Sequence, residues 1–446
     1  MKYTKLSLLM LSTALLATPE VNTLTEVFSE AKTSGNIKYY YIQTDKDHES
    51  AADTSAYANS LGGQLSFDSA SLYGFSGGVT FMTTNPFLLG PNVDTSIIGK
   101  DNGARGYDAQ KGFSVLGEAY LTYNYSDLGA TIGRKVIKTP LVHAKEVRML
   151  PSAVEGIFTE YRINKKSKVE IAYLDKFKQR TSDTFVDMYE HALAGDVERV
   201  TGKKSGSVVM VGVDYSHEIF NIKAYDYYAD DFMNTHYIEG TYKLNISDVK
   251  LSMSGQYLSQ KSIGNAEKNL LNDISIAGGD ISVNAFGLKL TSEFSSAKFC
   301  IAYSNVLRDD GNHDSVVSPW DGTPLFTNMI TSNDLFQSIY GQALQSDSIY
   351  IGGAQGIKFG YKQKFDSLGL EGFSTALSYL HTTFDRVDAD KDQNDYNIVL
   401  AYKANKAFAL ALKGIWVENN TAADAQGNVT QLKLLSQYRV IANYKF

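Results

Sequence analysis

The sequence lacks the features that mark several common classes of protein. Its 446 residues include one cysteine, Cys300, which excludes an internal disulfide, and only seven prolines. Beyond residue 17, no apolar run approaches the length of a membrane-spanning helix. Positive charge is also scarce, because 42 Lys and Arg residues against 49 Asp and Glu residues give a net charge of −7. That balance argues against a nucleic-acid-binding protein, so we expect no nucleic acid among the partners.

Alternation of apolar and polar residues is what the sequence has in abundance. Over its last ten residues, 437–446, the polar side chains share one face, where Ile441 is the one exception. Because side chains on a strand alternate with a period of two, one face of this segment suits lipid and the other suits water. A final strand of this kind is typical of outer-membrane barrels. The expected lipid-facing residues are Tyr438, Val440, Ala442, Tyr444 and Phe446.

The first residues have the pattern of a secretory signal peptide, which we place at residues 1–17. Two lysines come first, a mostly apolar stretch covers 6–16, and Ala17 is a small residue near a plausible cleavage site. A mature N-terminal helix is the alternative. Export predicts either a soluble protein or a barrel in the outer membrane of a Gram-negative bacterium. Residues 23–34 are then expected to form a short periplasmic segment with one helical turn.

Residues 35–446 predict a single all-β domain, a transmembrane antiparallel β-barrel of about eighteen strands. Most of the alternating segments have the roughly 9–11 residues that a tilted strand needs to cross a bilayer. For any single strand, a buried face of a β-sandwich is the alternative. The expected strands are 35–43, 57–67, 72–82, 113–125, 129–138, 155–163, 167–177, 206–216, 219–229, 234–244, 248–259, 281–293, 297–307, 348–365, 372–383, 394–403, 407–417 and 431–446.

The connections between these strands alternate in length along the chain. A barrel with both termini in the periplasm predicts this alternation, with short periplasmic turns at one rim and long extracellular loops at the other. A soluble sandwich has no reason to keep long and short connections in phase. The one departure is near 230–233, where a long loop is expected and a short connection appears.

The same alternation indicates which charged side chains point into the lumen. The acidic excess lies mostly in loops, whereas several basic residues fall on the inward face of strands. In a narrow channel such charges lower the barrier for anions. We therefore expect a modest preference for solutes that bear a carboxylate. The pore-lining basic residues that we select are Lys358, Lys362, Lys413 and Arg439.

Several motifs resemble those of the OprD family of outer-membrane porins. The strongest is Arg148-Met149-Leu150-Pro151-Ser152, and a second is Ser318-Pro319-Trp320-Asp321-Gly322-Thr323-Pro324 in the longest loop. The resemblance covers nearly the whole chain after the signal peptide. It implies an eighteen-stranded monomeric barrel with a narrow pore, through which small charged or polar solutes pass by facilitated diffusion. It also implies two loops folded inward, which here are the segments near 139–154 and 308–347.

The resemblance also suggests residues for the pore constriction, namely Arg148, Glu146 and Asp321. Arg148 belongs to the first motif, and the other two lie in or close to the motifs. A structural role is the alternative for Arg148, which could hold its loop to the barrel wall by hydrogen bonds. The chain departs from the family where a glycine-rich run is common, because Trp320-Asp321-Gly322 is bulkier and acidic.

Other functions stay open at this point. An outer-membrane barrel enzyme, such as a protease or lipase, needs a positioned nucleophile and base, and the sequence pattern singles out no Ser and His for these roles. An adhesin or structural barrel is a further alternative, and trimers are common among other porins. Asp388, Asp390 and Asp392 have the spacing that opens a calcium loop but lack its glycine. We expect no enzymatic activity and no cofactor; the expected partners are membrane lipid and small hydrophilic solutes.

Overall fold

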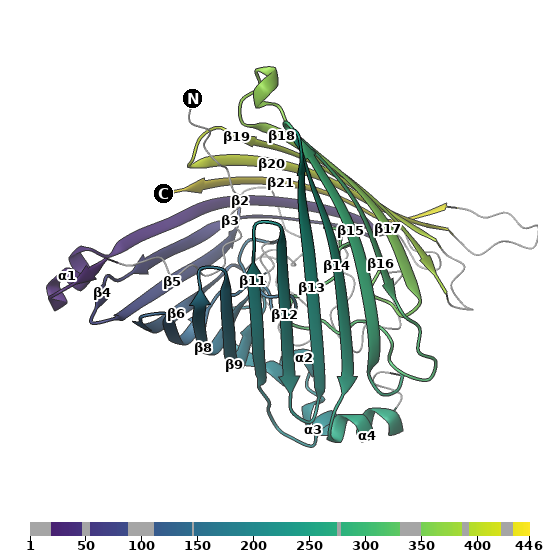
Figure 1. Ribbon diagram of the computed structural model, residues 1–446, viewed down its shortest axis with the longest axis horizontal. Helices are drawn as coiled ribbons and strands as arrows, with labels where there is room; N and C mark the ends of the chain where they lie inside the picture. The colour runs from purple at the N-terminus through teal and green to yellow at the C-terminus, as the bar shows by residue number, and fades with distance from the viewer. Residues whose placement is uncertain are drawn as a thin grey trace, which may run out of the picture.

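The chain forms one curved antiparallel sheet in the computed structural model (Figure 1). The structure describes residues 19–46, 54–87, 111–144, 147–273, 278–330, 349–385, 392–420 and 431–446. The predicted signal peptide, 1–17, lies outside these ranges. Within them, no helix combines the length and the apolar character that crossing a membrane requires.

Eighteen long strands make up the barrel wall, as the alternating pattern predicted. Each strand pairs antiparallel with its neighbours along the chain. The strands are β2 Lys32–Lys46, β3 Thr54–Asp68, β5 Phe75–Pro86, β6 Phe113–Tyr125, β7 Leu128–Lys135, β8 Ala153–Asn164, β9 Ser167–Lys178, β11 Val208–Ser216, β12 Phe220–Ala229, β13 Met233–Ile246, β14 Val249–Ser262, β15 Ser282–Phe294, β16 Ala297–Val306, β17 Ala354–Lys364, β18 Phe373–Phe384, β19 Gln393–Lys403, β20 Phe408–Asn420 and β21 Gln431–Lys445.

Shorter elements lie outside this wall. The segment predicted as an N-terminal periplasmic piece carries a helix whose first turn is capped by Thr23, before β2 begins at Lys32. Three further helices lie in the long loops. These elements are β1 Glu20–Val21, β4 Ser71–Leu72, β10 Val186–Asp187, α1 Leu24–Ser29, α2 Met188–Leu193, α3 Val197–Thr201, α4 Asn265–Asn272 and the 3-10 helix η2 Asp366–Leu368.

The first and last long strands close the sheet into a barrel. β2 pairs antiparallel with β21 from Asn36 opposite Lys445 to Asp45 opposite Ser436. Gly35 and Phe446 extend the ladder, because each backbone N–H donates to the carbonyl of the other, at 3.0 and 3.1 Å. A closed sheet leaves no unpaired edge to the membrane, where an unsatisfied backbone group is costly.

Several predicted strand boundaries were wrong, and two of these errors mark places where the chain leaves the wall. The strand predicted at 348–365 begins only at Ala354, because Gly353 adopts a φ of +86°, which interrupts the extended backbone. The strand predicted at 129–138 ends at Lys135, and residues 136–144 turn away from the wall into the lumen. In both places the chain is apolar enough to continue a strand, but it leaves the wall to build an inward loop.

The connections alternate as predicted, and the exception near 230–233 has a structural reason. The connection between β12 and β13 covers only residues 230–232. The loops on either side of this hairpin are long, and they contain α2 and α3 on one side and α4 on the other. Since α3 and α4 contact each other over the short turn, a long loop there would occupy the space that the helices fill.

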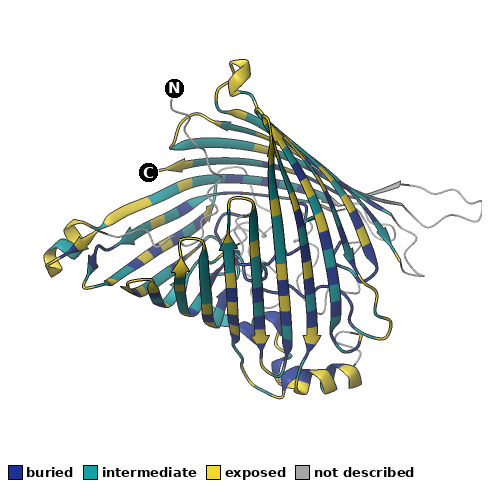
Figure 2. Ribbon diagram, viewed as in Figure 1, coloured by how far each residue is buried: buried dark blue, intermediate teal, exposed yellow. Residues whose placement is uncertain are grey.

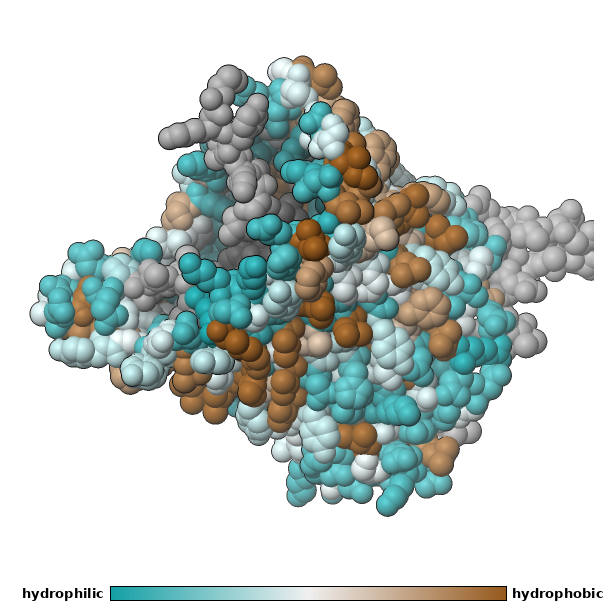
Figure 3. All heavy atoms as spheres, viewed as in Figure 1, coloured by the Kyte–Doolittle hydropathy of each residue, from teal (hydrophilic) through white to brown (hydrophobic). Residues whose placement is uncertain are grey.

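Exposure alternates along the strands, as Figure 2 shows. Outward residues such as Phe359, Ile398 and Leu400 are exposed, and apolar side chains gather on the part of the outer wall seen in Figure 3. Buried apolar residues of the inner wall pack instead against side chains of the loops, including Trp320 and Leu141. The lumen therefore narrows where the loops pack against the wall.

The contact between Gly35 and the last residue makes barrel closure sensitive to a single methyl group. A Cβ at Gly35 would lie 2.5 Å from the Gln64 carbonyl oxygen and 2.8 Å from the Phe446 ring. We expect Gly35→Ala to destabilise the barrel by about 1–3 kcal/mol, the usual range for overpacking. Heat-modified migration in detergent gels measures this as a lower unfolding temperature. Gly240→Ala is the matched control, because nothing lies within 4 Å of its added Cβ, and an equal loss there would contradict the explanation.

Candidate pore constriction

The loop that follows β7 lies inside the barrel against the seam between β2 and β21. Three inward side chains of the wall donate hydrogen bonds to its backbone carbonyls. The Lys38 ammonium donates to Met149 O at 2.9 Å, and the Tyr40 hydroxyl donates to Val147 O at 2.8 Å. Arg439 also donates to Val147 O, at 3.3 Å. The segment containing the Arg-Met-Leu-Pro-Ser motif is thereby held in the lumen.

The described part of the second predicted loop, residues 308–330, runs along another part of the inner wall, and residues 331–347 lie outside the described residues. Gln260 and Gln256, both on the inward face of β14, donate to Val317 O at 2.8 Å and Pro324 O at 2.5 Å. Further along the loop, Lys358 of β17 donates to Asn328 O at 2.5 Å. The loop thus spans from β14 to β17, so its path reduces the open cross-section.

Asp321 joins the two loops. Its carboxylate oxygens lie 2.5 Å from Arg180 Nη1 and 2.5 Å from the hydroxyl of Ser152, which donates a hydrogen bond. The backbone of the second loop also meets the first, because His143 N donates to Trp320 O at 3.0 Å. Asp321 is 1% exposed and adopts a φ of +63°, a conformation that suits glycine better. Asp321, which departs from the family's glycine-rich run, therefore forms a buried link between the two loops. We call this link, made by Asp321, Arg180 and Ser152, the clasp.

Of the other two residues predicted for the constriction, the structure describes Arg148 and not Glu146. Arg148 is buried beside the seam, and its Nη1 donates to the carbonyl of Val147 at 3.2 Å. Glu146 lies outside the described residues. Arg148 and Asp321 therefore contribute to separate contacts, one against the seam and one between the loops. Sequence reasoning missed Arg180, because a single arginine after a strand gives no sign of a partner so distant in the chain.

A cluster of positive charge lies along the seam beside the first loop. Lys413 of β20 stands directly opposite Arg439 of β21 in the sheet register. Arg439 is 1% exposed and is held by Gln437, whose side-chain oxygen accepts from its Nε at 2.6 Å. The charges that act most strongly on Lys413 are those of Arg439, Lys38 and Arg148, all positive. We call these four residues the seam cluster.

The structure brings together only part of the predicted basic stripe. Lys413 and Arg439 are neighbours in the seam cluster. Lys358 is on the wall at β17 and holds the second loop through Asn328, at some distance along the sheet from the seam. Lys362 is exposed near the turn into β18, opposite Lys298 in the register. Each is basic and directed inward, but they serve different parts of the channel.

Acidic residues gather on the opposite wall, at the strands that face the viewer in Figure 1. Lys168 Nζ lies 2.5 Å from Glu170, 3.5 Å from Glu160 and 3.5 Å from Asp214. The Tyr225 hydroxyl lies 3.0 Å from Glu170 and 3.1 Å from Asp214. The lumen thus has a positive wall at the seam, and across from it a wall where acidic side chains pair with basic ones such as Lys168 and Arg162.

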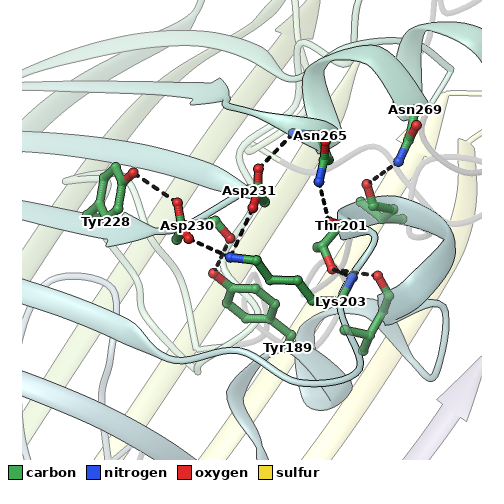
Figure 4. A network of polar contacts seen from close by, with 10 residues as sticks. Tyr189, Thr201, Lys203, Tyr228, Asp230, Asp231, Asn265 and Asn269 are labelled. Atoms are coloured by element: carbon green, nitrogen blue, oxygen red, sulfur yellow. Dashed lines mark hydrogen bonds and ion pairs between the residues drawn. The ribbon is translucent and has the colours of Figure 1, made fainter.

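A polar network ties the extracellular helices to the short turn between β12 and β13 (Figure 4). Lys203 forms ion pairs with Asp230 and Asp231, and Asn265 N donates to Asp231 at 3.0 Å. The Asn265 side chain donates to Thr201 O at 3.0 Å. α3 and α4 are thereby fastened to one rigid hairpin, so the long loops at this rim have a fixed base.

This network makes the attachment of the helices dependent on pH. Hydrogen bonds from Lys203 hold the pKa values of Asp230 and Asp231 below the ordinary value, while Asp230 raises the pKa of Lys203. The aspartates stabilise the folded network above their unfolded pKa, and this stabilisation is lost as pH falls through their lowered values. The lysine stabilises it below its unfolded pKa, and this is lost as pH rises through its raised value.

We expect the protection of α3 and α4 amides against hydrogen exchange, relative to the intrinsic rate at each pH, to be highest between these two limits and to fall beyond each. In Lys203→Met this maximum should disappear, while the protection of β14 amides should stay unchanged. An unaltered pH profile in this variant would show that the ion pairs do not hold the helices.

The closed antiparallel sheet, its apolar exterior and its polar lumen narrowed by inward loops define a class of protein, the outer-membrane channels of the porin type. The chain belongs to the OprD family of outer-membrane porins, whose model matches residues 26–446. It therefore resides in the outer membrane, where it conducts small solutes and contacts lipid. Porins are a class of channels rather than enzymes.

Solved structures of the same fold include three from Pseudomonas aeruginosa. OccK9 (OpdG) has 15% sequence identity, a TM-score of 0.72, and coverage of 94% of this chain and 99% of that one. OccK8 (OprE) has 16% identity, the same TM-score of 0.72 and the same coverage of 94% and 99%. OpdK, solved with vanillate, has 14% identity and a TM-score of 0.69, with coverage of 94% and 99%. No curated protein sequence matches the chain.

Proposed function

We propose that this porin favours small solutes bearing a carboxylate, and that the seam cluster selects them. The single observation that carries the proposal is the grouping of Lys38, Arg148, Lys413 and Arg439 on one wall beside the inward loop. A positive wall in a narrowed lumen lowers the energy of a passing anion. Carboxylate ligands in the relatives support the same class, since OpdK was solved with vanillate and OccK2 (OpdF) with glucuronate.

The wall across from the seam cluster adds a second preference. It carries the carboxylates of Glu170 and Asp214, which accept from the Tyr225 hydroxyl. Carboxylates accept hydrogen bonds, so hydroxyl or ammonium groups on the solute suit that side. We infer that solutes with a carboxylate at one end and hydrogen-bond donors at the other pass best.

Transport of this kind is passive and needs no chemical step or cofactor. We treat a single chain as the conducting unit, because β2 and β21 close the sheet within it. Asp321 then acts on the pore through the loops that it joins, and Lys358 acts on the second loop in the same way, whereas Arg148 belongs to the seam cluster.

Reconstitution of the refolded protein in planar bilayers tests the proposal. In a salt gradient at neutral pH, we expect a reversal potential of the sign that indicates anion preference. Liposome swelling should be faster with glucuronate than with uncharged glucose, although the two sugars are similar in size. Cation preference, or equal rates for the two sugars, would contradict the proposed selectivity while leaving the porin fold unaffected.

A further inference from the structure

Four polar side chains form a row on the outer wall, across β12, β13, β14 and β15. The register places Asp226 opposite His236, His236 opposite Ser259, and Ser259 opposite Asn284. Residues directly opposite in antiparallel strands have Cβ atoms roughly 4.5–5.5 Å apart on the same face. The row points outward, because Ile238 and Tyr257, two residues along the same strands, are among the exposed apolar residues. The row faces away from the pore.

The row lies where the apolar band of the outer wall ends on the loop side. Toward the periplasmic turns, the outward residues of β13 are Ile238, Tyr242 and Ile246, all exposed. Toward the loops, the next outward pair is Asn234 and Lys261, which stand opposite each other. A boundary from apolar to polar side chains marks the level where lipid headgroups meet their acyl chains. The ester bonds of membrane lipids lie at this level.

An acid and a base are already in contact within the row. His236 Nδ1 lies 2.8 Å from Asp226 Oδ1, and the side chains are 64% and 38% exposed on the isolated chain. Asp226 Oδ1 is itself shielded and has no aligned donor among the described residues. A slight turn of the imidazole would direct an N–H to it and leave Nε2 as the basic nitrogen. Catalytic hydrogen bonds are often misaligned before substrate binds.

A carboxylate on this part of the surface needs an explanation. Facing lipid is costly for Asp, and phosphate headgroups at the boundary repel it. A row that served only to contact headgroups would be better composed of amides, hydroxyls and basic residues. The carboxylate has a use if it orients and stabilises a histidine that becomes charged, which is the role of the acid in a catalytic triad.

The residues on the far side of His236 supply the remaining groups. Ser259 lies directly opposite the histidine on β14, on the side away from Asp226, so rotation of the two side chains can bring its hydroxyl to the imidazole. Asn284 comes next, and its carbonyl oxygen accepts from the Tyr257 hydroxyl at 2.6 Å. That contact orients the amide so that its N–H groups stay available as donors beside Ser259.

An apolar groove of about 340 Å³ adjoins the acid and the base on the outer surface. Hydrocarbon of an acyl chain suits it, since the groove opens toward the lipid and lies on the membrane side of the row. Its outward-facing lining is Val211, Val213, Ala224, Asp226, His236, Ile238 and Tyr257.

We propose that Ser259, His236 and Asp226 form a serine-hydrolase site for ester lipids of the outer leaflet. Ser259 Oγ attacks the ester carbonyl carbon while His236 takes the hydroxyl proton, and Asn284 donates to the developing oxyanion. The bond to the alkoxide breaks, His236 returns the proton, and a lysolipid leaves. Water, deprotonated by His236, then attacks the acyl-serine ester, which releases the fatty acid and regenerates Ser259. No redox partner or metal is required.

Hydrolysis of a diacyl phosphatidylethanolamine in mixed detergent micelles tests the site in the refolded full chain. We expect release of fatty acid that falls roughly 10³-fold or more in Ser259→Ala and His236→Ala, the scale of losing a triad member. A fluorophosphonate probe should modify the wild type once, on the peptide that contains Ser259. Ser292→Ala is the matched control, because Ser292 also faces outward on β15, between Leu251 and Phe299 in the register, with no histidine beside it.

Two results would overturn the proposal: fatty-acid release that Ser259→Ala leaves unchanged, or a probe that modifies a residue other than Ser259. Single-channel conductance distinguishes this site from the pore. Since the row lies on the outer wall, Ser259→Ala should conduct like the wild type. A variant that lost both activities would point to a folding defect, which heat-modified migration reports, and His236→Gln then provides the second test of the same site.

Discussion

Replacing Asp321 by alanine is expected to raise the single-channel conductance several-fold and to make the current unsteady. The substitution leaves Arg180 buried without the carboxylate that lies 2.5 Å from it, and it removes the acceptor of the Ser152 hydroxyl. Breaking a buried ion pair by removing one partner costs roughly 3–5 kcal/mol. That cost is large compared with the few hydrogen bonds that hold either loop, so we expect the two loops to separate and the lumen to widen.

Two further variants show whether the charge is the cause. Ser152→Ala removes a single hydrogen bond, worth about 1 kcal/mol, and should leave conductance nearly unchanged. The double variant Arg180→Met with Asp321→Asn removes both charges, so no uncompensated charge stays buried and the steady, low conductance should largely return. If Asp321→Ala conducts like the wild type, the clasp does not control the width of the pore.

Much of the wall was predictable from sequence because membrane strands obey a strict period of two. Phe359, Ile398 and Leu400 face lipid, and Lys413 and Arg439 face the lumen, as their parity requires. The predicted strand boundaries were wrong where something other than alternation decides the path of the backbone. The Gly353 backbone delays the start of β17, although the residues before it are suitable for a sheet.

The contacts of the clasp could not be predicted from the alternation of side chains along the strands. Asp321 was a candidate because of its motif, but its partners Arg180 and Ser152 are far from it in sequence, and neither follows a strand pattern. A contact between two loops depends on how both fold back into the lumen. Such a path is set by many weak contacts with the wall, which a single sequence does not encode in any local signal.

The row on the outer wall could not be recognised from the sequence for a related reason. Asp226, His236 and Ser259 are separated by ordinary intervals in the chain, and no motif surrounds them. Only the register of three neighbouring strands brings them into one line, and a shift of one residue would send one member into the lumen. Register therefore decides whether these residues form a site at all, while the sequence pattern fixes only which face each residue occupies.

Reversing one charge in the seam cluster is expected to change the ion selectivity of the pore by at least about tenfold. Lys413 is half-buried in the lumen opposite Arg439, and its strongest electrostatic neighbours are all positive. At roughly 7 Å, a unit charge acts on a passing anion by about 0.6–2.4 kcal/mol, depending on the effective dielectric constant. Lys413→Glu changes the charge by two units and acts in opposite senses on anions and cations. Since about 1.4 kcal/mol corresponds to a factor of ten, the anion-to-cation permeability ratio should fall at least roughly tenfold.

Reversal potentials in a salt gradient measure this ratio directly. Lys413→Gln should give an intermediate value, because it removes one charge where Lys413→Glu replaces it with the opposite one. Lys362→Glu is the control, since Lys362 is exposed near a periplasmic turn and its charge is screened by water and salt. Equal shifts in Lys413→Glu and Lys362→Glu would mean that net charge of the lumen, rather than the seam cluster, sets the selectivity. The seam cluster is chosen over that simpler explanation because the first loop is held in the lumen beside it, which keeps a passing solute on the side of the half-buried Lys413 and within the field of the buried charges behind it.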